Sequence, residues 1–394
     1  MKMIKIKSVN FIIVLVTILL LCQKVAFHIS GFEFSVAIFL MPVLSLNYLS
    51  RKQLHLNTNR FILFLIMIFF MSLLTLYNDN NSNIPSLLLF IYIYIWFCFD
   101  LDTDNNEKEK IYNCVRTVIF FSAVIGVVQF IGQLLGFPYF DIFDLISNQV
   151  KLSGFNTYYP ISYGSRIIKS NGWIYLEPSF FSQFMAMGIV LEMNNKKFDK
   201  NSIIHIVTYS LALLVSFSGT GMILLGISLV PMLKKISLKN RIILILALII
   251  GLFAFSQTEF FYAISSRVFE YRASGSSGAI RFVNPYIVAF NNNNFFLGNG
   301  AGAADRIVYS FEVNHNAITK VMIEYGFVCL LLFITYVISS FCKKGISTFI
   351  VCLLVMYFFL AGNLLQPSIT FLLFFLKEID TPFSNNERNV IKVT

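Results

Sequence analysis

The chain has 394 residues, of which 57% are hydrophobic and 13% are charged, and its mean hydropathy is +0.74. Soluble domains carry about 25% charged residues, so this composition excludes a soluble enzyme and indicates a polytopic α-helical membrane protein. The net charge of +10 does not indicate nucleic-acid binding, because much of it lies in short loops where Lys and Arg set membrane orientation.

The N-terminal segment "MKMIKIKSVN" and the apolar run "FIIVLVTILLLC" together resemble a signal peptide. No small-residue cleavage site follows, and Leu21 before Cys22 does not suit a lipoprotein site. We therefore expect an uncleaved first span. None of the six cysteines falls in the loops expected outside, so the sequence predicts no disulfide framework.

Apolar runs long enough to cross about 30 Å of hydrocarbon recur along the whole chain. They predict an all-α bundle of about 12 transmembrane helices in a single membrane domain, residues 1–394, although the last two runs could form one re-entrant pair. The expected spans are 10–27, 32–49, 60–77, 84–99, 115–136, 176–193, 202–217, 220–233, 242–257, 316–341, 346–360 and 362–376.

The distribution of Lys and Arg predicts that both termini are cytoplasmic. With the N-terminus inside, the positive charges gather in cytoplasmic connections, and short outer turns such as "NDNNSN" and "SGTG" carry almost none. These cytoplasmic charges are Lys2, Lys5, Lys7, Arg51, Lys52, Arg60, Lys196, Lys197, Lys200, Lys234, Lys235, Lys239, Arg241, Lys343 and Lys344.

Two long loops, 137–175 and 258–315, are expected on the outer, periplasmic face, and loops of such length usually carry function. Their basic residues are mostly Arg, whose planar fork grips phosphate or carboxylate with two bonds. This bias favours a phosphorylated or acidic ligand, but salt bridges with loop carboxylates would also account for it. The arginines are Arg166, Arg267, Arg272, Arg281 and Arg306.

The stretch "NGWIYLEPSF" places Glu177 directly before Pro178 at the start of an apolar run. Proline is favoured in the first turn of a helix, so we expect Glu177 at the helix cap, against the positive end of the helix dipole. Ser179, Ser182 and Gln183 follow on a polar side that should face the bundle interior. Glu177 is either a plain capping carboxylate or a functional acid at membrane depth.

His315, in "VNHNAITKVMIEYG", is the one histidine expected where a long outer loop meets a membrane helix. Asn316, Lys320 and Glu324 follow at four-residue spacing and should share one helix face. Histidine is the natural proton acceptor near neutral pH, which makes His315 a candidate general base. A structural histidine that bonds a loop carbonyl is the alternative.

Two glycine-rich or acidic stretches look like ligand loops but lack the required context. "FFLGNGAGAAD" has nucleotide-loop glycines without a preceding strand or a βαβ unit. "DLDTDNN" lacks the central Gly and the terminal Glu of a calcium loop, and we interpret it as a cytoplasmic turn. No cluster of His and Cys residues suggests a metal site.

The order of these motifs resembles bacterial O-antigen polymerases of the Wzy type. The resemblance covers roughly residues 115–340 and rests on "GWIYLEPSFFSQ", "SFSGTGM", "NPYIVAFNNNNFFLGNGAG" and "HNAITKVMIEYG" in that sequence. It implies a GT-C-like membrane glycosyltransferase of lipopolysaccharide or related polysaccharide biosynthesis. It also implies a multi-pass protein of the bacterial cytoplasmic (inner) membrane.

The resemblance implies a metal-independent, cofactor-free glycosyl transfer at the periplasmic face. A glycan on undecaprenyl pyrophosphate is the donor, and its reducing-end sugar moves to a hydroxyl of another lipid-linked repeat unit. By motif position, His315 and Glu177 are the catalytic candidates and Arg281 the principal diphosphate ligand. Arg267 and Arg272 share its loop and are further candidate diphosphate ligands. Arg166 is a looser match, because relatives place Arg where this chain has Lys169.

The implied partners are lipid-linked repeat units, membrane lipids and a chain-length regulator protein, without nucleic acid. Two other functions remain open at this point. An O-antigen ligase would transfer the polymer to lipid A core, and a flippase or other transporter would carry out no chemistry. Transporters often show internal repeats and charges at the membrane midplane, whereas here no repeat is evident and the polar groups gather in the outer loops.

Overall fold

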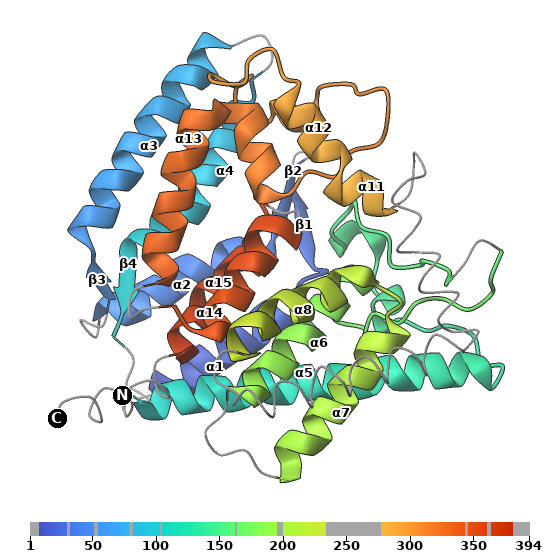
Figure 1. Cartoon of the computed structure of the whole chain (residues 1–394). Helices are drawn as coiled ribbons and strands as arrows, with labels where there is room; N and C mark the ends of the chain where they lie inside the picture. The colour runs from blue at the N-terminus through green and yellow to red at the C-terminus, as the bar shows by residue number, and fades with distance from the viewer. Residues whose placement is uncertain are drawn as a thin grey trace.

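The computed structural model describes residues 8–29, 32–50, 54–78, 82–102, 105–161, 164–194, 200–233, 277–342, 346–360 and 364–380. The chain is mostly helical (Figure 1). Three helices are long and apolar enough to cross a membrane: α3 (Thr58–Tyr77), α5 (Asn105–Leu134) and α13 (Ala317–Phe341).

Every expected span within the described residues contains a helix, but most of these helices are shorter than the roughly 20 residues that a full crossing requires. Twelve crossings are therefore not shown, and the expected span 242–257 lies outside the described residues. The shorter helices are α1 (Ser8–Leu21), α2 (Val36–Ser50), α4 (Ile84–Tyr94), α6 (Pro178–Met193), α7 (Lys200–Val215), α8 (Gly219–Leu233), α14 (Thr348–Val355) and α15 (Pro367–Leu376).

The mostly helical fold agrees with the predicted all-α class, but two small antiparallel sheets lie at the ends of apolar runs where helix was expected. Strands β1 (Ala26–Ile29) and β2 (Phe32–Ser35) pair between α1 and α2, and β3 (Leu54–Leu56) pairs with β4 (Phe99–Leu101). Hydropathy alone does not separate an apolar strand from an apolar helix. The expected spans consequently ran several residues too far.

The acidic stretch expected as a cytoplasmic turn is partly helical, since α5 already begins at Asn105 and includes "NNEKEK". Glu and Lys are good helix formers, and Glu107 and Lys108 are both buried. The second long loop likewise contains two short helices among its described residues, α11 (Ser277–Phe282) and α12 (Asn284–Phe290).

Helix α6 is the buried centre of one half of the molecule. Every residue from Pro178 to Glu192 is buried, and the helix packs against α5, α7, α8 and α14. A Cβ on Gly221 of α8 would lie 2.3 Å from the backbone oxygen of Ser182, so glycine permits this close approach. Ser182 also accepts a bond from Gly221 N at 3.1 Å, and its hydroxyl lies 3.1 Å from that of Thr220. The "SGTG" hairpin thus fixes the start of α6.

Loops that the alternation of spans assigns to one face do contact one another. On the side expected to be outer, Lys24 pairs with Asp141, and Asn83 N donates to Ala301 O at 2.7 Å. At the opposite end, Arg60 pairs with Asp100, and Lys377 Nζ donates to Ser340 Oγ at 2.7 Å. These contacts gather the connections into two separate ends of the bundle.

Helix α13 is broken at Gly326, whose φ of 76° and ψ of 176° are not helical. The segment 295–300 lies across this break. Asn299 N and Gly300 N donate to the carbonyls of Ile323 and Glu324 at 2.9 and 2.8 Å, and Phe327 N donates to Phe295 O at 2.9 Å. Segment 295–300, hereafter the strap, therefore satisfies backbone groups that the break exposes and ties the second long loop to α13.

Candidate functional site

The turn that precedes Glu177 has an unusual backbone. Gly172 and Trp173 have φ values of 61° and 66°, in the left-handed region. The Asn171 side chain is fully buried, accepts from Trp173 N at 3.0 Å and donates to Asp141 at 2.8 Å. A Cβ on Gly172 would lie 2.7 Å from Ser122 O of α5. This packing turns the chain sharply into α6 and sets the place of Glu177.

Glu177 occupies the cap position of α6, as predicted, but its side chain makes no capping bond. Its carboxylate turns to Arg281 of α11, with Oε2 2.7 Å from a guanidinium nitrogen. Ser179 Oγ donates to the same oxygen at 3.1 Å, and Asn156 N donates to Oε1 at 3.4 Å. Glu177 therefore forms an ion pair in place of a side-chain capping bond.

The Glu177–Arg281 pair lines a cavity of about 170 Å³, hereafter the ion-pair cavity. Its other polar lining groups are Ser179, Asn314 and Asn316, and its remaining walls include aromatic rings. The side chains of Glu177 and Arg281 are 11% and 22% exposed, so solvent screens their attraction only in part. Two motifs 104 residues apart meet here, together with the asparagine that follows His315.

His315 lies just before α13, whose first turn Asn316 caps by accepting from Thr319 N at 3.0 Å. The imidazole is buried, and neither ring nitrogen has a hydrogen-bond partner among the described residues. Burial, followed by the positive charge of Lys320, lowers the pKa of His315 to about 4, against a smaller opposing effect of Asp305. His315 is consequently neutral at physiological pH, and the same burial makes it a weaker base than an ordinary histidine.

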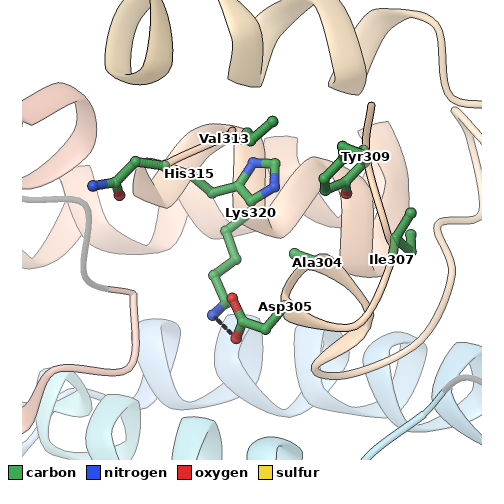
Figure 2. Close-up of a pocket in the computed structure, with 8 residues that line it drawn as sticks. Ala304, Asp305, Ile307, Tyr309, Val313, His315 and Lys320 are labelled. Carbon is green, nitrogen blue, oxygen red and sulfur yellow. Dashed lines mark hydrogen bonds and ion pairs between the residues drawn. The ribbon is translucent and has the colours of Figure 1, made fainter. Parts of the chain in front are cut away.

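A second cavity, of about 320 Å³, opens at His315, hereafter the histidine cavity. Figure 2 shows the ring of His315 near that of Tyr309, with ring centroids 5.7 Å apart. Lys320 Nζ pairs with Asp305 at 2.5 Å, and Glu324 Oε1 lies 4.0 Å from the same ammonium group. Lys320 and Glu324 share a helix face, as predicted. Asn314 lines both cavities.

The remaining predicted diphosphate ligands are not brought to either cavity by the described structure. Arg166 has an exposed side chain and lines neither cavity. Arg267 and Arg272 lie outside the described residues. Arg306 donates to Ser82 O at 3.0 Å, which fits a structural role.

Sequence reasoning missed Tyr309 and Asn314 as lining residues. Both stand close before His315 in "YSFEVNHN", and a polar or aromatic residue next to a candidate base in an outer loop could have indicated them. Loop carboxylates were considered only as salt-bridge partners of the arginines, whereas one of them, Asp305, lines the histidine cavity.

No protein-family model matches the chain, and no curated protein matches it at a significant level. Within the described ranges, no group of three or more His, Cys, Asp or Glu side chains is arranged to hold a metal ion.

Proposed function

We propose that the protein polymerises undecaprenyl-pyrophosphate-linked oligosaccharide repeat units into O-antigen or a related surface polysaccharide, as a glycosyltransferase of the bacterial cytoplasmic membrane. The observation that carries the proposal is the Glu177–Arg281 ion pair at 2.7 Å in the ion-pair cavity. It joins an acid and a guanidinium fork from separate motifs, next to the motif that holds the candidate base.

Arg281 supplies the group that a diphosphate leaving group requires. When the anomeric carbon–oxygen bond of the donor breaks, its electron pair passes to the diphosphate, where negative charge increases. A fixed guanidinium stabilises this charge in the transition state, and its fork makes two parallel bonds to phosphate oxygens. In the resting protein, Glu177 occupies one side of that fork, so the donor diphosphate competes with Glu177 for Arg281.

The acceptor hydroxyl is a poor nucleophile and needs a base. Its oxygen forms the new bond to the anomeric carbon, and its proton passes to a nearby side chain. The geometry favours His315 for this step, because its ring nitrogens line a cavity and have no partner among the described residues. Glu177 becomes the alternative base once the diphosphate has taken Arg281. Neither step requires a metal ion or cofactor.

The proposed topology has both termini in the cytoplasm and the two cavities on the periplasmic face. The separation of the loop contacts into two ends supports this arrangement, because residues of both cavities belong to loops of the same end. The implied partners are lipid-linked repeat units, bilayer lipids and a chain-length regulator.

The test is reconstitution of the purified protein in liposomes with lipid-linked repeat units as both donor and acceptor. We expect a ladder of products that lengthen by one repeat unit, with release of undecaprenyl pyrophosphate. In a parallel reaction, pre-formed polymer on the same lipid is offered with lipid A core. Transfer to lipid A core without chain growth would identify a ligase. If neither product forms, the proposal of glycosyl transfer is refuted.

A further inference from the structure

The histidine cavity contains polar groups that the protein itself leaves unsatisfied. Both ring nitrogens of His315 and the hydroxyl of Tyr309 are buried and have no hydrogen-bond partner among the described residues. Leaving such a group without a partner costs about 1–3 kcal/mol. His315 and Tyr309 line the same cavity, and both have buried polar atoms without a hydrogen-bond partner among the described residues, which indicates that the cavity binds a hydrogen-bonding ligand (Figure 2).

The balance of donors and acceptors fits hydroxyl groups. A neutral imidazole offers one donor and one acceptor, and burial raises the pKa of Tyr309 to about 12, so its hydroxyl keeps its proton and can both donate and accept. Asn314 also lines this cavity. Sugar hydroxyls are likewise both donors and acceptors, and the ring of Tyr309 offers an apolar face for the C–H groups of a pyranose.

The charges around this cavity disfavour an anionic ligand. Lys320 is the cation of the lining, and it is already paired with Asp305 and lies 4.0 Å from the carboxylate of Glu324. Its positive charge is therefore opposed by two acidic side chains. A phosphate or carboxylate would gain no net attraction here, in contrast to the ion-pair cavity with its guanidinium fork.

The size of the cavity sets the size of the ligand. Its volume of about 320 Å³ lies at the lower end of the roughly 300–1,000 Å³ typical of small-molecule sites. It suits one sugar ring and not a whole repeat unit. We propose that the histidine cavity is a binding site for a single uncharged sugar and, on the basis of the proposed function, that it holds the acceptor sugar whose hydroxyl is activated.

Binding is tested without turnover by saturation-transfer NMR on the purified protein in nanodiscs. The probes are free glucose, galactose, mannose, rhamnose, fucose, N-acetylglucosamine and N-acetylgalactosamine, with glucuronate and galacturonate as charged counterparts. We expect transfer to at least one neutral sugar and weaker transfer to the uronates. Tyr309→Phe removes one hydroxyl and should weaken binding about 2- to 13-fold, the equivalent of one hydrogen bond. Tyr158→Phe, in the outer loop that precedes α6, is the matched control and should leave binding unchanged.

No transfer to any sugar, equal transfer in the Tyr309→Phe protein, or stronger transfer to a uronate than to every neutral sugar would overturn the inference. The liposome reaction separates this failure from failure of the proposed function. There, Tyr309→Phe should raise the KM for the acceptor and leave the KM for the donor unchanged. Chain growth with no sugar bound in this cavity would refute the inference alone. Sugar binding that depends on Tyr309, without any glycosyl transfer, would refute the polymerase alone.

Discussion

Replacing both members of the Glu177–Arg281 pair by glutamine separates a structural ion pair from a working site. Arg281→Gln alone leaves the Glu177 carboxylate, only 11% exposed, with Ser179 Oγ and Asn156 N as its remaining donors. Removing one partner of a fully buried pair costs roughly 3–5 kcal/mol. Because Arg281 is 22% exposed, solvent relieves part of this cost, and we expect about 2 kcal/mol for each single variant.

The double variant, Glu177→Gln with Arg281→Gln, contains no unpaired charge, and its two amides can bond to each other. We expect its loss of stability to be smaller than the sum of the single losses by about 0.5–3 kcal/mol, as is typical of residues in contact. The measurement is a thermal unfolding midpoint in detergent, followed by intrinsic fluorescence, for the four proteins of the cycle.

The same four proteins are then compared in the liposome polymerisation reaction. If Arg281 binds the diphosphate, the double variant regains stability but stays inactive, and Arg281→Lys is also impaired because an ammonium group lacks the fork. If the pair only holds the loop against α6, activity should return together with stability. Full chain growth by the Gln/Gln protein would therefore refute our assignment of Arg281.

Four further outcomes follow from the site. His315→Ala should lower turnover about 10²- to 10⁴-fold while lipid-linked substrate still binds. If the His315→Ala protein is active and the Glu177→Gln protein is folded but inactive, Glu177 is the base. The pKa of His315 is lowered to about 4 in the folded protein, so as pH falls the unfolded chain takes up the proton first. The stability of the folded protein should therefore decline between about pH 6.5 and pH 4. Lys320→Gln removes a nearby positive charge and should raise the pKa of His315, as measured by NMR titration. Polymerisation activity should be unchanged in EDTA. If EDTA abolishes the activity and addition of one metal ion restores it, the reaction is not metal-free. A cysteine at Ser153, an exposed position, should react with an impermeant thiol reagent in intact spheroplasts; protection there would place the site in the cytoplasm.

The sequence predicted the positions of the helices better than their lengths. Composition and apolar runs gave the class of protein, and Pro178 marked the first residue of α6. The ends of several spans were wrong, because "AFHI" and "FEFS", which extend into two expected spans, pair as strands. The two strands are separated by only two residues in the sequence, and apolar and polar residues alternate in "FEFS". A search for long apolar runs does not register such a short alternation.

For the site, the sequence indicated which residues to consider but not how they combine. Glu177, Arg281 and His315 were chosen from motifs, yet only the fold shows that Glu177 turns from its own helix to Arg281. It also shows that His315 opens into a different cavity from this pair. The direction of a side chain at a helix end depends on the partner that packing brings near, so a capping position and a functional position look identical in sequence.

The glycines of "FFLGNGAG" illustrate how a motif can be important without binding phosphate. A Cβ on Gly298 would lie 2.4 Å from the backbone oxygen of Glu324, and one on Gly326 would lie 2.1 Å from that of Phe296. The two backbones approach so closely that only glycine fits at both positions. This contact holds the strap against the break in α13. The first turn of the same helix follows His315 and contains Lys320. The strap is also held to α13 by the Asn299 side chain, which donates to Ile323 O at 3.1 Å, and by stacking of Phe295 on Phe327. Its glycines therefore act through close backbone packing, without the strand and βαβ unit that a nucleotide loop requires.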